Sequence, residues 1–263
     1  MSNTVTDLLI QRKSVRAFTD KEITAEDKEL ILTCAVQAPT AGNQQLYTIL
    51  DITDPSLQAA LAESCDHQPF IAEAKMILIF CADCRKWYEA FRDAGCEPRE
   101  PGVGDFLLAV DDALIAAQNA QVAAESLGIG SCYIGDIMEN YELHREMLHL
   151  PEYVFPAAML VFGYPAQSQI ERQKPERAPM SSIVFENRYP DMGPQELHAL
   201  FENKTRNMDL AALKKIYGDA AIDRRYAAWM QAFCQRKYNS AFAREMSRSA
   251  AAFMKQFKST GSL

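Results

Sequence analysis

The sequence predicts an α/β or α+β protein built on a central β-sheet. Segments with the pattern of helices and of buried strands alternate along the chain, and residues 105–127 form one long helical run without glycine or proline. The composition is that of an ordinary globular protein, with 48% hydrophobic and 24% charged residues. No linker is long enough to require two separate domains, so residues 1–263 are predicted to form a single domain.

The first third of the chain predicts two helices and two strands. Residues 4–12 have the pattern of a short helix, and Thr24–Asp27 resembles a capping box at the start of a helix over 25–37, because a threonine hydroxyl can accept an orphan N–H there. Leu46–Ile52 is a short run rich in β-forming residues, and the apolar run KMILIFC at 75–81 is typical of a buried strand.

The run over 105–127 is the strongest helix signal in the chain. Its apolar residues cover well over half of the circumference and its alanines let other backbones approach closely, so we expect it inside the fold or at a subunit interface. Gly128 ends this helix, and 128–137 is predicted as turn, strand and turn. A helix near 139–148 and a strand over 157–162 follow.

The C-terminal part differs from the rest in charge. Residues 165–179 are loop-like, and the chain from Gln195 on is mostly helical in pattern. Residues 201–263 carry 12 Lys/Arg and 5 Asp/Glu, whereas residues 1–200 carry 15 and 30. A basic tail after an acidic body can indicate an anionic partner. The acidic body argues against a general nucleic-acid binder, whose binding domain is usually basic throughout.

The sequence contains no signal for a membrane or for secretion. No run of about 18 uncharged apolar residues exists, so no transmembrane helix is expected. The start lacks the basic end and long apolar core of a secretory signal. Seven cysteines are scattered along the chain, most of them in apolar surroundings, which indicates a reduced cytoplasmic protein without a disulfide framework.

Three groups of residues could bind a ligand, and the first is Arg12-Lys13-Ser14-Val15-Arg16. On a helix, Arg12 and Arg16 share a face. On an extended segment, Ser14 points the same way as both arginines. Guanidinium groups pair bidentately with anionic oxygens, so either conformation suits a phosphate. The more common alternative is a solvated basic turn.

The other two groups are loops. Ala38–Gln45 is a turn whose Thr40, Asn43 and Gln45 supply neutral donors and acceptors, which suit a ring with alternating polar atoms. Gly128–Asp136 lacks the spacing of a dinucleotide-binding turn or a P-loop, but its glycines let backbone approach a flat ligand. Taken singly, a plain polar loop and a helix stop before a strand are the alternatives.

Together, these groups resemble the FMN-dependent nitroreductase family. RKSVRAF, APTAGNQQ, AAESLGIGSCYIGDI and VFGYPAQ followed by RAP occur in this order at suitable distances. The similarity is closest to the branch of NADPH-type nitroreductases and flavin reductases, and it covers roughly residues 5–190. It implies a three-layer α+β fold, in which helices flank a mostly antiparallel sheet, with a helical C-terminal extension over 195–263.

The resemblance implies a set of residues around the FMN phosphate. The positions that match the phosphate and ribityl ligands are Arg12, Lys13, Ser14 and Arg16, with Lys13 supplying its backbone and possibly charge. Arg177 matches a second arginine on the phosphate side, with Lys174 as its nearby competitor. The segment Lys174–Arg177 is one residue longer than the usual Lys-Pro-Arg of the branch, and the following Ala-Pro favours Arg177.

A second implied set surrounds the isoalloxazine ring. Its members are Thr40, Asn43, Gln45, Gln68, Tyr133, Ile134, Gly135 and Asp136. Thr40, Asn43 and Gln45 usually come from the partner subunit, because enzymes of this family are homodimers with two FMN sites at the interface. Asp136 departs from the family, which often has glycine there. A carboxylate directed at the flavin would disfavour its anionic reduced form.

The basic tail has two interpretations. Arg244 and Arg248 share a helix face, and Glu245-Met-Ser-Arg248 is similar to a C-terminal element that carries an arginine over the flavin. Arg248 is therefore the first candidate for the phosphate of NADPH and Arg244 the second. The alternative is a solvated helix face.

The resemblance implies an FMN-dependent oxidoreductase that passes hydride from NAD(P)H through flavin N5 to a nitroaromatic, a quinone or free flavin by a ping-pong scheme. The chemistry lies on the flavin, so no catalytic side chain is predicted, and no metal, nucleic acid or membrane is expected. An FMN-binding, storage or sensor protein without efficient turnover and a flavin-dependent dehalogenase are the alternatives.

Tyr47, Trp87 and Tyr88 could line a substrate pocket or belong to the core. Cys81 and Cys84 form a CxxC that we interpret as structural.

Overall fold

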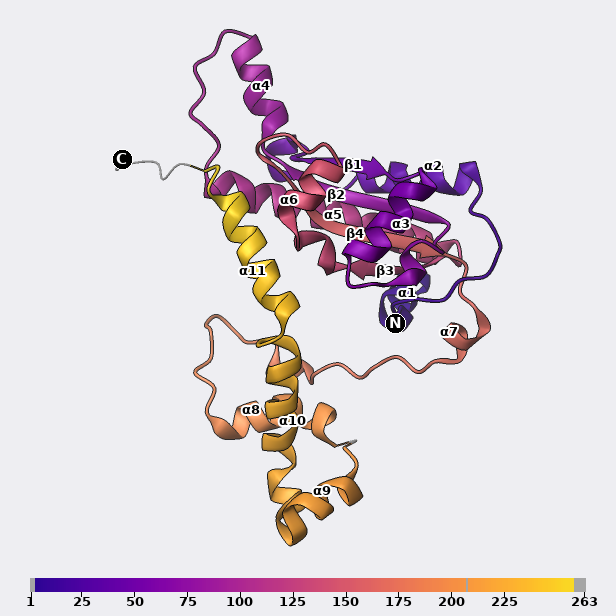
Figure 1. Ribbon diagram of the computed structural model, residues 1–263, viewed down its shortest axis with the longest axis vertical. Coiled ribbons are helices and arrows are strands. Elements are labelled where there is room, and N and C mark those ends of the chain that lie inside the picture. Colours follow the sequence, from indigo (N-terminus) through magenta and orange to yellow (C-terminus); the bar gives the residue numbers. More distant parts are fainter. Residues whose placement is uncertain (1–2, 207, 258–263) are drawn as a thin grey trace. The chain divides into compact units, whose positions relative to one another are not determined.

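The computed structural model describes residues 3–206 and 208–257 (Figure 1). The chain divides into two compact units. The first unit comprises residues 1–172 and 245–263, and the second comprises residues 173–244. Each unit is described by itself below. That the chain is a single domain stays a prediction.

The first unit is built on one antiparallel four-stranded sheet. Its strands are β1 (Tyr47–Asp51), β2 (Met76–Asp83), β3 (Gly130–Ile134) and β4 (Val154–Gly163). They lie in the order β1-β2-β4-β3, so β1 and β3 are the two edges. Every residue of β2 and β4 is buried, as expected for central strands covered on both faces.

Helices cover both faces of this sheet and give three layers. Leu78, Phe80 and Leu160 point to one face, where they pack with the alanines of α5 (Val103–Ser126) and with α2 (Ala25–Val36). Residues of the opposite parity, such as Ile77, Ile79 and Met159, pack with α3 (Pro55–Ser64) on the other face. The alternation follows from the two-residue period of a strand. The predicted three-layer α+β fold is confirmed.

The remaining helices of the first unit are short. They are α1 (Thr4–Gln11), α4 (Arg85–Asp93), α6 (Tyr141–Met147) and α7 (Gln167–Glu171). The helices α3 and α4 were absent from the prediction, and α7 lies in a segment predicted as loop. At the start of α2, Thr24 Oγ1 accepts a hydrogen bond from Asp27 N at 3.0 Å, which confirms the N-cap half of the predicted capping box.

The long helix α5 is buried along one side and exposed along the other. Its alanines at 109, 113, 116, 117, 120 and 124 are fully buried against the sheet. Its exposed side carries the large apolar residues Val103, Leu107, Leu108, Leu114 and Ile115. Gly128 ends the helix with a φ of 73°, in the left-handed region that favours glycine.

The helices from residue 194 on are α8 (Pro194–Thr205), α9 (Leu210–Tyr217), α10 (Ala221–Lys237) and α11 (Ala241–Met254). The residues of α11 from Glu245 on belong to the first unit. There Phe253 is fully buried, with its ring centroid 4.9 Å from Phe106 and 4.8 Å from Phe155. No helix among the described residues has the length and apolar character needed to cross a membrane.

Candidate functional site

The basic N-terminal segment is extended and lies along edge strand β3. Ser14 forms a parallel bridge with Ser131, and Val15 N donates to Ser131 O at 2.9 Å. Gly130 makes this approach possible, since a Cβ built there would lie 2.5 Å from Val15 Cγ2. Of the two conformations that the sequence left open for this segment, the structure has the extended one.

Arg12, Ser14 and Arg16 lie close enough to Cys132 to affect the pKa of its thiol. Burial raises the pKa of the Cys132 thiol, while the positive charges of Arg16 and Arg12 and hydrogen bonds from Ser14 and Arg16 oppose this rise. Arg12 Nε and Ser131 Oγ are buried and have no hydrogen-bond partner among the described residues. The segment and strand thus offer two guanidinium groups and two hydroxyls, of which Arg12 Nε and Ser131 Oγ are unsatisfied, and such groups suit an anionic phosphate.

Lys13 points to the other side of the segment. Its Nζ donates to Ile170 O at 2.7 Å and to Arg172 O. Arg172 in turn donates from Nη2 to Ser14 O, and Gln169 Oε1 accepts from Arg16 N at 3.2 Å. The segment after β4 therefore holds residues 12–16 in their extended form. Arg172 was missed in the sequence, although it lies only two residues before the candidate Lys174.

Lys174 and Arg177 lie in the second unit. The carbonyl oxygen of Arg177 accepts a hydrogen bond from Asn203 Nδ2 at 2.8 Å, and the Arg177 side chain is exposed. Their part in a phosphate site stays a prediction.

The opposite end of β3 carries the predicted ring contacts. Tyr133 OH donates to Gln118 Oε1 at 3.4 Å, Ile134 is buried and Gly135 is exposed. Burial raises the pKa of Tyr133 to about 12, and the charge of Arg12 opposes the rise. Gly135 lies four positions after Ser131, which is about 13 Å along a strand. One edge of the sheet thus presents a cationic cluster at one end and exposed glycine backbone at the other.

Gln68 and Asp136 meet at this glycine end. Gln68 Nε2 donates to Asp136 Oδ2 at 3.0 Å and to Cys65 O at 2.7 Å. The sequence left the direction of the Asp136 side chain open, and the structure directs its carboxylate at Gln68.

Glu139 is a buried acid beside Asp136. Its side chain is 6% exposed, and its Oε1 has no hydrogen-bond partner in the described part of the structure. Burial raises the pKa of Glu139 to about 7, with further contributions from the negative charges of Asp136, Asp66 and Glu245. The folded chain therefore holds a proton on Glu139 at a pH where the unfolded chain has released it.

We expect Glu139→Gln to change the pH dependence of stability. The ordinary pKa of Glu139 is 4.5 and its pKa in the folded chain is about 7. Between these two pH values the folded wild type binds more protons than the unfolded chain, so its free energy of unfolding falls as pH rises. Glutamine does not titrate, so the variant should gain about 3 kcal/mol relative to wild type on going from below to above this window. Urea unfolding across the window measures it. Parallel profiles for the two proteins would contradict the assignment.

The polar loop Ala38–Gln45 is held in place by a buried carboxylate of α5. Asp112 accepts from Ala41 N at 2.9 Å through Oδ1 and from Leu46 N at 3.0 Å through Oδ2, and it is 2% exposed. Asn43 and Gln45 have φ values of 56° and 52°, in the left-handed region. The loop leads directly into β1, the edge of the sheet opposite β3. Asp112 was missed in the sequence.

Within the loop, Thr40 Oγ1 accepts from Gln45 N at 3.2 Å, and Gln45 Nε2 donates to Val36 O at 3.4 Å. Thr40 therefore shapes the turn, while the Asn43 side chain is exposed. Thr40, Asn43 and Gln45 lie in one turn that leads into edge strand β1, whereas residues 12–16 lie along edge strand β3. Their part in a ring site stays a prediction.

A cavity of about 420 Å³ adjoins this loop. It is lined by residues of the loop, of α4 and of the turn before α5, including Gln44, Trp87, Tyr88, Phe91 and Pro98. Trp87 Nε1 donates to Gln44 O at 2.7 Å, which ties the aromatic wall to the loop. Of the three aromatic residues that the sequence offered for a pocket, Trp87 and Tyr88 line the cavity, whereas Tyr47 is buried in the core.

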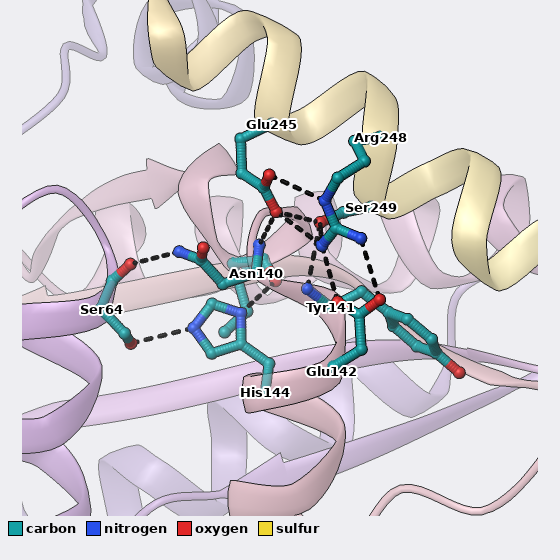
Figure 2. A network of polar contacts seen from close by, with 9 residues as sticks. Ser64, Asn140, Tyr141, Glu142, His144, Glu245, Arg248 and Ser249 are labelled. Carbon is teal, nitrogen blue, oxygen red and sulfur yellow. Dashed lines mark hydrogen bonds and ion pairs between the residues drawn. The ribbon is translucent and has the colours of Figure 1, made fainter.

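Arg248 is engaged in a network that joins α11 to α6 (Figure 2). Its guanidinium donates to Glu142 at 2.9 and 2.6 Å and to Glu245 at 2.9 and 2.8 Å. Ser249 Oγ, from the same helix, accepts from Tyr141 N at 3.0 Å. An incoming nicotinamide phosphate would have to replace one of these carboxylates, so the network favours a structural role. Arg248 and the exposed Arg244 as nicotinamide-phosphate ligands stay predictions.

The remaining candidates have structural explanations. Cys81 and Cys84 are buried, and burial raises the pKa of each thiol to about 12, so neither is a ready thiolate. Buried His144 contacts Ser64 Oγ and Ile137 O, each at 2.9 Å. Within the described part of the chain, no group of His, Cys, Asp or Glu residues could hold a metal ion.

The fold and these residues define a class: a three-layer α+β protein with two arginines and exposed glycine backbone along one edge of its sheet. The comparisons specify that class. The model of the nitroreductase family matches residues 9–164. The chain is 32% identical over 191 residues to "FMN reductase (NADPH)" of Bacillus subtilis (strain 168), covering 72% of this chain and 75% of that protein. The chain belongs to the nitroreductase family.

Two further relatives extend the comparison. The chain is 37% identical over 190 residues to "Oxygen-insensitive NADPH nitroreductase" of Salmonella typhimurium (strain LT2), covering 72% of this chain and 75% of that protein. The solved structure of B. megaterium NfrA2 is 28% identical with a TM-score of 0.79, and the match covers 98% of this chain and 100% of that one.

Proposed function

We propose that the protein is an FMN-dependent oxidoreductase that takes hydride from NADPH or NADH and reduces an aromatic acceptor such as a nitroaromatic, a quinone or free flavin. The observation that carries the proposal is the cationic cluster on edge strand β3, with its unsatisfied Arg12 Nε and Ser131 Oγ. The names of the relatives support the same activity, since they are NADPH-dependent FMN reductases and nitroreductases. The residues present fit FMN.

In the proposed enzyme, the residues of the chain bind FMN and orient it. Arg12, Ser14 and Arg16 would hold the phosphate, and the backbone at Ile134–Asp136 would face the ring. When bound, FMN supplies the redox chemistry by accepting a hydride from the nicotinamide and passing it to the second substrate. The cavity beside Trp87 and Phe91 has apolar, aromatic walls that suit an uncharged planar acceptor.

We further propose a homodimer with each FMN between two chains. Within one chain the polar loop adjoins edge β1 and the phosphate-binding segment adjoins edge β3, which are about 14 Å apart across three strand spacings. A ring contacted by both therefore draws the loop from a second copy. The exposed apolar row on α5 supplies a surface for that contact.

The proposal extends to the domain organisation of the chain and to its location in the cell. The match to NfrA2 over 98% of the chain supports residues 1–263 as one domain with a helical C-terminal extension from about 195. The cysteines are all free, Cys65, Cys81, Cys84 and Cys132 among them, which supports the reducing cytoplasm as its location.

Leu107→Glu should break the dimer. Leu107 is 58% exposed in the α5 row, and a glutamate placed in an apolar interface loses its hydration without gaining a partner. Sedimentation should show monomers, and FMN retention should fall with dimerisation. Leu143→Glu on α6, 48% exposed, is the matched control and should remain dimeric. A dimer that survives Leu107→Glu with FMN bound would contradict this interface.

Reconstitution tests the proposed function. The purified chain, incubated with FMN and desalted, should be yellow and should consume NADPH faster when a nitroaromatic or quinone is added. A protein that stays colourless would overturn the proposal. A yellow protein that consumes no nicotinamide with any acceptor would instead be an FMN-binding protein.

A further inference from the structure

The side-chain amide of Gln68 is fixed in one orientation. Its Nε2 lies 2.7 Å from Cys65 O and 3.0 Å from Asp136 Oδ2. A backbone carbonyl can only accept a hydrogen bond, and a carboxylate likewise offers acceptors, so both positions require the NH₂ end of the amide. Both of its hydrogens are thereby used. The carbonyl oxygen Oε1 is therefore the atom of the Gln68 amide that can accept a hydrogen bond from a ligand.

The backbone around Gln68 is constrained as well. The two preceding residues, Asp66 and His67, have φ values of 65° and 51°, which cost energy for residues other than glycine. Gln68 N donates to Ala62 O at 2.9 Å, and the next residue is Pro69. This turn returns the chain from the end of α3 towards the end of β3. Strained backbone that is held by several hydrogen bonds indicates a side chain with a required position.

Asp136 joins this turn to the predicted ring site. It follows the exposed Gly135 at the end of β3, and its carboxylate is the acceptor that reaches Gln68 across 68 residues of sequence. Glu139 and Cys65 lie close enough for its negative charge to raise their pKa values. The carboxylate of Asp136 therefore adds negative charge to surroundings that are already acidic, which is unfavourable. Its hydrogen bond to Gln68 is the favourable contact that it makes there.

We propose that Asp136 is a positioning residue that withholds the NH₂ group of Gln68 from the FMN ring and leaves Oε1 as the atom offered to it. This inference rests on the proposed function. A carbonyl oxygen can pair only with a ring donor, and reduction adds one such donor to the ring, at N5. Beside N5, Oε1 therefore favours the reduced ring, whereas an NH₂ group there would favour the lone pair of the oxidised ring.

The test separates hydrogen bonding from charge. Asp136→Asn removes the charge and keeps an oxygen that can accept from Gln68, whereas Asp136→Ala removes both. Asp136→Gly is a second variant without the acceptor, in case the alanine variant does not fold. The midpoint potential of bound FMN is measured for each, together with the dissociation constant of oxidised FMN.

We expect the potential of Asp136→Ala to lie below that of Asp136→Asn. The preference for reduced over oxidised FMN should differ about tenfold, which is about 30 mV for a two-electron couple. In a Gln68→Ala background, Asp136→Ala and Asp136→Asn should give the same potential, because the effect acts through Gln68.

Equal potentials for Asp136→Ala and Asp136→Asn in the wild-type background would overturn the assignment, since Asp136 would then act through charge or not at all. A difference that persists in the Gln68→Ala background would overturn it as well. If wild type binds no FMN, the proposed function fails instead, so the two failures are distinguishable.

Discussion

Asp112→Ala is expected to lower the free energy of unfolding by about 2–4 kcal/mol, because each buried donor left unsatisfied costs about 1–3 kcal/mol. Asp112 is the partner of Ala41 N in the middle of the polar loop and of Leu46 N directly after it. Without the carboxylate the loop loses the contacts that fix its shape. In the proposed dimer this loop lines the partner's FMN, so FMN retention should fall as well. Urea unfolding and the flavin content after desalting measure the two effects.

Two variants control this prediction. Asp111→Ala changes the neighbouring, exposed aspartate of α5 and removes the same charge, so it should leave both measurements near wild type. Asp112→Asn keeps one acceptor oxygen and should give an intermediate loss. If Asp112→Ala and Asp111→Ala behave alike, the carboxylate does not hold the loop.

Arg16→Glu is expected to weaken FMN binding at least about 100-fold. Hydrogen bonds to charged groups contribute about 1.5–3 kcal/mol each, and the variant adds repulsion between glutamate and phosphate. Arg16 is exposed and its side chain acts on Cys132 beside Arg12 and Ser14, so the change should leave the fold intact. Fluorescence titration of the apoprotein with FMN gives the dissociation constant.

Arg92→Glu is the matched control. It makes the same change of net charge on α4, where the Arg92 side chain is 57% exposed. Its FMN affinity should equal that of wild type. Unchanged affinity in Arg16→Glu would remove Arg16 from the phosphate site and leave Arg12 and Arg172 to account for it.

The parts of the fold that could be predicted are those whose sequence signal is local. β2 and β4 are continuous apolar runs, α5 is a long helical run without breakers, and Thr24 caps α2 as its position indicates. α4 has nine residues and none of them is buried, so its amphipathic pattern spans too few turns to stand out in the sequence. The same limit applies to α7, which has five residues.

The site could be predicted only in part, because some of its determinants are tertiary. The arginines at 12 and 16 are visible as a pair, but their extended conformation depends on the bridge from Ser14 to Ser131. The role of Asp112 depends on backbone N–H groups 71 and 66 residues away. The pairing of Gln68 with Asp136 likewise spans 68 residues. None of these contacts leaves a pattern in a single sequence.

The basic tail illustrates how structure changes the meaning of a charge pattern. Arg248 is the first candidate for a nicotinamide-phosphate ligand in the sequence, with a solvated helix face as the alternative, yet its guanidinium is bound by Glu142 and Glu245. Those carboxylates hold the pKa of Arg248 above its ordinary value, and the guanidinium lowers the pKa of each carboxylate to about 2. Arg248 therefore joins α6 to α11, and it would have to leave one of these carboxylates to bind a ligand.

The most direct test of the central claim is anaerobic mixing of the FMN-loaded protein with NADPH, and separately with NADH, while the flavin absorbance is followed. The proposed oxidoreductase should lose the yellow band within the mixing time with at least one nicotinamide and regain it when a nitroaromatic or quinone is added. A band that persists with both nicotinamides would contradict the claim and would leave an FMN-binding protein without turnover.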